Sequence, residues 1–201
     1  MKRINKGRAF RQAGFTLMEL LIVIGVLGIL AAGLLAAIDP FEQLKKARDT
    51  NNRSAAIEFL GSSQRYYATH GYLPWYKMTG AAYDCLTTVA PLRTADTTSP
   101  WAAVAVSKSG GSGDTVMKTC IDSTLLVDGE IKTTFFEGLA TTLYITSGSP
   151  TKVMVCFPPE GKSNLADESS KYVYNSTNKE VSLVACTAAD KTAGNCLQCF
   201  E

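Results

Sequence analysis

An uncharged apolar run from Leu20 to Ile38 is the feature that most restricts how this chain of 201 residues can fold. Together with the residues from Phe15 onward it predicts a helix of about 36 Å, long enough to cross the hydrocarbon core of a bilayer. One carboxylate, Glu19, stands at the start of this run. Because a carboxylate is expensive to bury in a membrane helix, we expect Glu19 to have a specific partner.

The segment before the apolar run is basic and contains no acid. Residues 1–14 carry Lys2, Arg3, Lys6, Arg8 and Arg11. A basic segment of this kind stays in the cytoplasm, so the part of the chain after the apolar run is expected to be exported. The predicted location is the cytoplasmic membrane, crossed once with the N-terminus inside.

A general secretory signal is one alternative for this region. It would place a small-residue cleavage site after the apolar stretch, and Ala31-Ala32-Gly33 and Ala36-Ala37 are loose candidates for one. That alternative leaves Glu19 and the junction between the basic segment and Gly14-Phe15 unexplained.

The junction Gly14-Phe15-Thr16-Leu17-Met18-Glu19 closely resembles the class III signal peptide of type IV pilins and pseudopilins. The resemblance implies cleavage between Gly14 and Phe15 by a prepilin peptidase, followed by N-methylation of Phe15. It also implies a filament in which Glu19 pairs with the N-terminal amine of Phe15 on an adjacent subunit. The implied partners are other copies of the chain, the prepilin peptidase, an inner-membrane assembly platform with its ATPase, and membrane lipid before assembly.

Small residues recur along the apolar helix at Gly28, Ala32 and Ala36. A stripe at this spacing lets helices approach closely, which a filament core would use. Removal of the leader takes away five of the 20 basic residues and none of the 18 acids, so the remaining chain has a formal charge of −3. That charge gives no indication of nucleic-acid binding.

A second helix is predicted after the apolar run. Asp39 and Pro40 are suited to starting it, and Gly71 with Pro74 to ending it. Between them, apolar residues at helical spacing alternate with charged ones and predict an amphipathic helix. The apolar positions of this predicted face are Phe41, Leu44, Ala47, Ile57, Leu60 and Tyr67.

The remainder of the chain predicts an α+β head. Residues 72–114 are interpreted as a loop region, because residues 76–114 are rich in Thr, Ser, Ala and Gly. Residues 115–201 contain three pairs of β-like runs with turn signals between them, which predict an antiparallel sheet packed on the amphipathic helix. The predicted organisation is a cleaved leader at 1–14, a membrane and filament-core helix at 15–39, an amphipathic helix at 40–71, the loop region, and a sheet with a disulfide-tied tail. The three predicted hairpins pair 124–127 with 131–136, 143–146 with 152–157, and 172–174 with 180–185.

Six cysteines lie beyond the helices, and an even number in an exported domain favours disulfides. The sequence leaves all 15 pairings open. The resemblance to pilins implies that a cysteine of the C-terminal segment ties that segment to the sheet. Cys196-Leu197-Gln198-Cys199 also permits a zinc or redox site, although no second Cys-x-x-Cys is present. The disulfide candidates are Cys85, Cys120, Cys156, Cys186, Cys196 and Cys199.

Enzymatic chemistry finds little support in the sequence, and we expect neither a catalytic site nor a cofactor. His70 is the only histidine, and neither a nucleophile-elbow motif nor a phosphate-binding loop is present. No metal site is predicted, although scattered acidic residues leave calcium open without any EF-hand pattern. Those acidic residues are Asp122, Asp128, Glu130, Asp167 and Glu168.

Four aromatic residues in or near the loop region could recognise a ligand at the surface, or they could simply cover the core. They are Trp75, Tyr76, Tyr83 and Trp101. Single-stranded DNA is one conceivable ligand, but no basic stripe accompanies them. The sequence as a whole predicts a structural pilin subunit. It would polymerise through its N-terminal helix into a type IV pilus filament at the cell surface, for adhesion, motility or DNA uptake. The alternatives are a pseudopilin of a type II secretion system and an anchored exported domain that does not polymerise.

Overall fold

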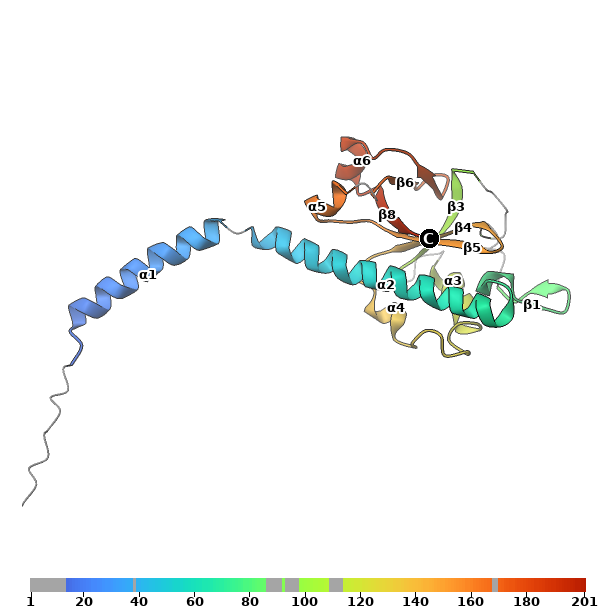
Figure 1. Cartoon of the computed structure of the whole chain (residues 1–201), viewed down its shortest axis with the longest axis horizontal. Helices are drawn as coiled ribbons and strands as arrows, with labels where there is room; N and C mark the ends of the chain where they lie inside the picture. The colour runs from blue at the N-terminus through green and yellow to red at the C-terminus, as the bar shows by residue number, and fades with distance from the viewer. Residues whose placement is uncertain (1–13, 38, 86–91, 93–97, 109–113, 168–169) are drawn as a thin grey trace, which may run out of the picture. The chain divides into compact units, whose positions relative to one another are not determined.

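The computed structural model describes residues 14–37, 39–85, 92, 98–108, 114–167 and 170–201 (Figure 1). The chain divides into two compact units, residues 1–40 and residues 41–201, and each is described here by itself. The described part of the first unit forms helix α1 (Leu17–Ala37). We call the second unit the head domain, and the combination of helices with an antiparallel sheet makes the fold α+β.

The long helix of the head domain, α2 (Pro40–His70), begins at the proline, whose fixed φ suits a first helical turn. The predicted apolar face of α2 is wrong at Phe41, Leu44 and Ile57, because these side chains are exposed. The buried stripe is shifted around the helix and includes polar side chains near its start. Its members are Asp49, Asn52, Ala56, Phe59, Leu60, Ser62, Ser63 and Tyr66.

The buried stripe of α2 is polar near its start because backbone N–H groups from another part of the chain donate hydrogen bonds to it. The carboxylate of Asp49, which is 1% exposed, accepts hydrogen bonds from the backbone N–H of Glu160 and of Gly161, each at 2.8 Å. It also accepts one from Asn164 Nδ2 at 2.7 Å. A Cβ atom on Gly161 would lie 3.0 Å from Asp49 Oδ2, so glycine permits this close approach. We call Asp49 with residues 160–164 the Asp49 clasp.

Six antiparallel strands form a closed barrel in the order β3-β4-β5-β8-β6-β7, with β7 pairing back to β3 (Figure 1). The register places Ala103 opposite Thr146, Thr146 opposite Met154, and Cys156 opposite Cys199. The strands are β3 (Trp101–Val106), β4 (Leu143–Ser149), β5 (Lys152–Phe157), β6 (Tyr172–Asn175), β7 (Glu180–Leu183) and β8 (Cys196–Phe200).

The two faces of the sheet belong to two buried clusters, because side chains alternate along each strand. Val153, Val155 and Phe157 of β5 join the large cluster that includes Phe59 of α2. Met154 and Cys156 of β5 join the smaller cluster together with Val181 and Leu197. The large cluster thus ties the sheet to α2, as the predicted packing of sheet on helix requires.

Short elements complete the head domain. The 3-10 helix η1 follows α2, and β1 and β2 pair with each other as a separate two-stranded sheet. Helix α3 packs against β3, and α6, which contacts β8, is a short excursion between β7 and β8 (Figure 1). These elements are η1 (Pro74–Tyr76), β1 (Met78–Thr79), β2 (Ala82–Tyr83), α3 (Asp114–Asp122), α4 (Phe135–Gly138), α5 (Lys162–Leu165) and α6 (Ala188–Ala193).

Two of the three predicted hairpins are confirmed, and the first is wrong. The paired strands β4–β5 and β6–β7 match the second and third predictions. In place of the first hairpin, α3 continues into turns, and α4 follows. Gly129, with φ of +71°, lies at the end of these turns. Its backbone N–H donates to the carbonyl of Leu126, and the backbone N–H of Glu130 donates to the carbonyl of Leu125. A glycine with positive φ is common both in a turn after a helix and in a hairpin turn, and Gly129 lies in a turn after a helix.

Two strands of the barrel were not predicted. β3 lies inside the segment interpreted as a loop region, and β8 lies inside the segment interpreted as a tail. The sequence of β3, Trp-Ala-Ala-Val-Ala-Val, is rich in alanine, which has a weak strand preference. Its pairing with both β4 and β7 supplies the stability that its own residues do not signal.

Candidate functional site

The start of α1 is held by a reciprocal pair of hydrogen bonds between Thr16 and Glu19. The backbone N–H of Thr16 donates to Glu19 Oε2 at 3.1 Å, and the backbone N–H of Glu19 donates to Thr16 Oγ1 at 3.2 Å. The Thr16 hydroxyl also donates to Glu19 Oε2 at 2.9 Å. This is a capping box, a role for Thr16 that sequence reasoning missed, although Thr-x-x-Glu before an apolar run is its signature.

The rest of α1 exposes apolar side chains on all sides. Leu17–Leu35 is long and apolar enough to cross a membrane, and none of it is buried within the structure. A helix that is apolar all round requires burial in lipid or against other helices. Gly28 and Ala32 lie one turn apart on this helix, and a Cβ atom on Gly28 would meet nothing within 4 Å. This surface is therefore open to lipid or to a neighbouring helix.

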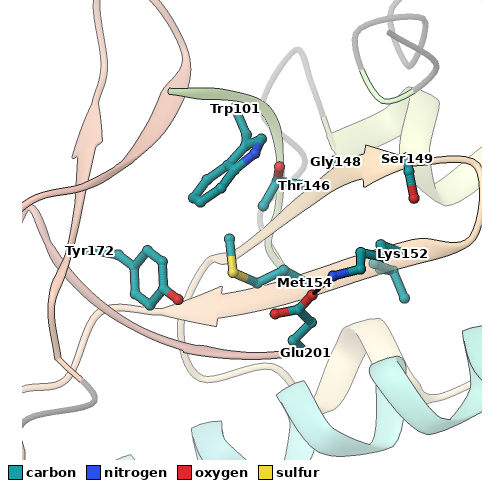
Figure 2. Close-up of a pocket in the computed structure, with 9 residues that line it drawn as sticks. Trp101, Thr146, Gly148, Ser149, Lys152, Met154, Tyr172 and Glu201 are labelled. Atoms are coloured by element: carbon teal, nitrogen blue, oxygen red, sulfur yellow. Dashed lines mark hydrogen bonds and ion pairs between the residues drawn. The ribbon is translucent and has the colours of Figure 1, made fainter. Parts of the chain in front are cut away.

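The aromatic residues singled out from the sequence separate into two groups. Trp75 is fully buried in the large cluster, and Tyr76 packs against it half-buried, so both cover the core. Tyr83 lies in β2, and its side chain is outside the described set. Trp101 is half-buried and lines a cavity opposite Tyr172 of β6, with ring centroids 6.3 Å apart (Figure 2).

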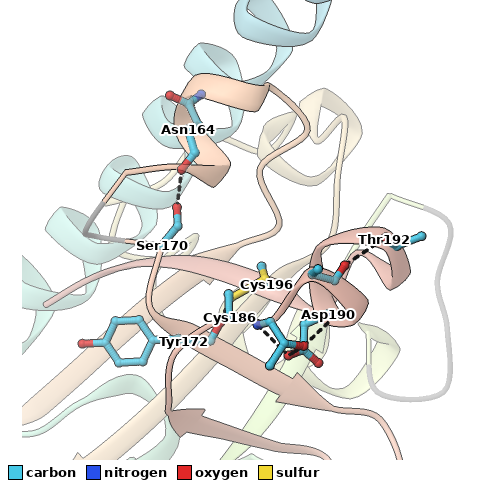
Figure 3. Close-up of a disulfide and its surroundings, with 9 residues drawn as sticks. Asn164, Ser170, Tyr172, Cys186, Asp190, Thr192 and Cys196 are labelled. Carbon is cyan, nitrogen blue, oxygen red and sulfur yellow. Dashed lines mark hydrogen bonds between the residues drawn. A yellow bond between two sulfur atoms is a disulfide. The ribbon is translucent and has the colours of Figure 1, made fainter.

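Three disulfides join the six cysteines of the head domain. Cys156 of β5 is bonded to Cys199 of β8, and this bond ties the C-terminal strand to the sheet. Cys186 is bonded to Cys196, which closes a loop around α6 (Figure 3). The two cysteines of the Cys-x-x-Cys motif therefore belong to two different disulfides. The third disulfide joins Cys85 to Cys120 of α3.

The loop closed by the second of these disulfides is itself well ordered by hydrogen bonds. Thr187 and Asp190 form a capping box at the start of α6, and Gly194, with φ of +72°, ends the helix. The hydroxyl of Thr187 donates to Asp190 Oδ2 at 2.6 Å. Hydrogen bonds from the side chain and backbone of Thr187 hold the pKa of the Asp190 carboxyl below its usual value.

His70, the last residue of α2, is engaged in local contacts. Its ring stacks on Tyr66 with centroids 4.1 Å apart, and its Nε2 lies 3.4 Å from Asp128 Oδ2. The acidic residues considered for calcium are dispersed, and Glu130 is paired with Arg65 at 2.6 Å. Within the described residues, no group of three or more His, Cys, Asp or Glu side chains could hold a metal ion. Glu168 lies outside the described residues.

Comparison with known proteins identifies the N-terminal segment. Residues 9–35 match the family model of the prokaryotic N-terminal methylation motif. No curated protein and no solved structure is significantly similar to the chain. The matched segment contains Gly14, Phe15 and Glu19 and most of α1. This motif, followed by an exposed apolar helix, fits the class III signal of type IV pilins and pseudopilins.

Proposed function

We propose that this chain is a structural subunit of a type IV pilus. The precursor is inserted in the cytoplasmic membrane, cleaved between Gly14 and Phe15 by a prepilin peptidase, and methylated at Phe15. An assembly platform and its ATPase then draw it from the lipid into a filament at the cell surface. The observation that carries the proposal is α1, which exposes apolar side chains on all sides and carries a single charge, Glu19.

Glu19 is proposed to select the axial position of each subunit in the filament. Its Oε2 is occupied by Thr16, while Oε1 has no hydrogen-bond partner among the described residues. The carboxylate can therefore keep its cap and still receive the amine of Phe15 from an adjacent subunit. In the low dielectric of a filament core, a charge left without this partner would be strongly unfavourable.

The proposal is tested by electron microscopy and mass spectrometry of filaments sheared from the native cells. We expect an abundant chain that begins at methylated Phe15, with its mass lowered by the six hydrogens lost in three disulfides. A processed chain found only in the membrane fraction, with no filaments, would contradict the pilus and favour a pseudopilin or an anchored domain.

Three variants separate the charge of Glu19 from its capping role. Glu19→Ala removes both, Glu19→Gln keeps a capping oxygen without the charge, and Thr16→Ala weakens the cap while keeping the charge. We expect filament yield to collapse in both Glu19 variants and to persist in Thr16→Ala. Normal filament yield in Glu19→Ala would refute the pairing with Phe15, and loss of yield in Thr16→Ala alone would assign the effect to the cap.

A further inference from the structure

A cavity of about 310 Å³ opens at one end of the barrel, at the lower end of the size range of small-molecule sites. Its walls come from four strands and the residue after β8, so residues far apart in sequence meet there. Figure 2 shows Met154 beside the rings of Trp101 and Tyr172, with Lys152 and Glu201 on its other side. The cavity thus has an aromatic end and a charged end.

The aromatic end has the form of an open angle. The rings of Trp101 and Tyr172 are inclined at 46°, with their centroids 6.3 Å apart, and both line the cavity, so one group in it can contact both rings. The thioether of Met154 adds a polarisable floor. Glu201 lines the same cavity as Tyr172, and burial and then the charge of Glu201 raise the pKa of the Tyr172 phenol. Aromatic faces beside a carboxylate attract a bulky organic cation.

The charged end is an ion pair that a ligand can replace. Lys152 Nζ lies 2.9 Å from Glu201 Oε1, and the two side chains are 68% and 59% exposed. An ion pair this exposed contributes little to stability, because water and salt screen it. A ligand that brings one charge of each sign would give both groups a new partner, and the number of ion pairs would not fall.

One hydroxyl in the cavity wall has no hydrogen-bond partner. Thr146 is 1% exposed, and its Oγ1 is unsatisfied among the described residues. A buried unpaired hydroxyl in a folded protein calls for an explanation, and an acceptor atom on a ligand supplies one. Thr146 lies opposite Met154 in the barrel register, so this donor adjoins the aromatic end.

We propose that this cavity binds a phosphocholine group. The trimethylammonium lies in the cavity against the Trp101 and Tyr172 rings beside the Glu201 carboxylate, the phosphate pairs with Lys152, and the Thr146 hydroxyl donates to an oxygen of the ligand. The aromatic and thioether walls give N-methyl groups apolar contact, so a quaternary ammonium suits them better than a primary one. The site lies wholly in the head domain and does not depend on polymerisation.

The binding test is calorimetric titration of the full chain in a polyoxyethylene detergent, which carries neither choline nor phosphate. We expect saturable binding of phosphocholine with one site per chain. Choline and inorganic phosphate should each bind roughly tenfold more weakly, since each lacks one of the two charged groups. Phosphoethanolamine should also bind roughly tenfold more weakly, because its ammonium lacks the three methyl groups that contact the aromatic rings. Absence of saturable binding, or equal affinity for phosphoethanolamine, would overturn the proposal.

Variants assign the two ends of the ligand. Trp101→Leu should weaken both phosphocholine and choline roughly tenfold, whereas Lys152→Met should weaken phosphocholine and leave choline unchanged. Lys171→Met removes the same charge from an exposed lysine that does not line the cavity, and it should bind like the wild type. If Trp101→Leu does not fold, Lys152→Met, a change at an exposed position, still tests whether phosphocholine binds in this cavity. Equal phosphocholine affinity in Lys152→Met and the wild type would refute the site.

A soluble lipid distinguishes a lipid headgroup from free phosphocholine as the source of the bound group. Dibutyryl phosphatidylcholine carries phosphocholine as a diester and stays monomeric in water. Binding as tight as that of free phosphocholine would identify a lipid headgroup or another diester as the ligand. Binding of free phosphocholine alone would identify the terminal monoester. Each of these results supports the phosphocholine site, and failure of both compounds to bind overturns it.

Discussion

The helices α1 and α2 follow one another with only two residues between them, yet they are built in opposite ways. α1 has one charged residue, and none of its membrane-length stretch is buried within the structure. α2 is rich in charge and buries eight residues, including Asp49 and Asn52. The chain supplies the environment of α2 from its own head domain, whereas the environment of α1 has to come from lipid or from other copies. The burial of α2 is therefore complete within one chain, whereas that of α1 is not.

The largest expected effect is confined to the head domain. Replacing Cys156 and Cys199 by Ala opens a bond that spans 43 residues, and the chain-entropy relation gives a loss of about 4 kcal/mol in unfolding free energy. The same change at Cys186 and Cys196, which span 10 residues, should cost about 3 kcal/mol. Denaturant titration of the full chain in detergent, followed by fluorescence of the buried Trp75, measures both. Equal losses of unfolding free energy in the two double variants would contradict the dependence on loop length. A loss of α1 helicity would contradict the independence of α1 from the head domain.

A charge introduced into each helix tests the comparison directly. Leu27→Arg puts a charge in the middle of α1 and should disfavour membrane insertion by about 3 kcal/mol, roughly a hundredfold. Leu44→Arg puts the same charge on an exposed position of α2 and should change neither insertion nor stability. Alkaline extraction of membranes reports the inserted fraction. Equal insertion of the Leu27 variant and the wild type would remove the membrane role of α1.

The Asp49 clasp predicts a somewhat smaller effect within α2. Asp49→Ala leaves the backbone N–H groups of Glu160 and Gly161 without their acceptor, and it should lower the unfolding free energy by about 2 kcal/mol. Glu58→Ala, an exposed change on the same helix, should stay within about 0.5 kcal/mol of the wild type. The same denaturant titration compares the two. A neutral Asp49→Ala would show that the polar half of α2 is not held by this clasp.

Alkaline pH should lower the stability of the head domain and leave α1 unchanged. This is the smallest of the four effects predicted here. Burial is the first cause that raises the pKa of Tyr66, Tyr172 and Tyr174 above the ordinary value of 10.0. The folded state therefore holds these protons more tightly than the unfolded state. Their contribution to stability is complete below pH 10 and is lost as pH rises through the folded pKa values. Chemical unfolding between pH 9 and pH 12 should show this decline, and Tyr172→Phe should reduce its slope. A slope unchanged by Tyr172→Phe would contradict a raised pKa at that residue.

The same contrast explains how much could be predicted from the sequence. α1 was evident because a helix in lipid depends on composition, and composition is local. The hairpins β4–β5 and β6–β7 were evident because strand and turn signals lie side by side along the chain. β3 and β8 were missed because each is stabilised by partners distant in sequence, and the polar stripe of α2 was missed because Asp49 meets donors more than 100 residues away. At the N-terminus, sequence reasoning identified Glu19 but missed Thr16, whose signature was present. The cavity could not be predicted, since its walls meet only when the barrel closes.

Closure of the barrel limits aggregation between head domains that lie close together. A strand at the margin of an open sheet offers a row of unpaired backbone groups, onto which an identical chain can add as a further strand. In the barrel each strand already has a neighbour on both sides within its own chain, from β3 around to β7. Many copies can therefore be concentrated on a membrane or along a fibre without templating cross-β aggregation through these strands.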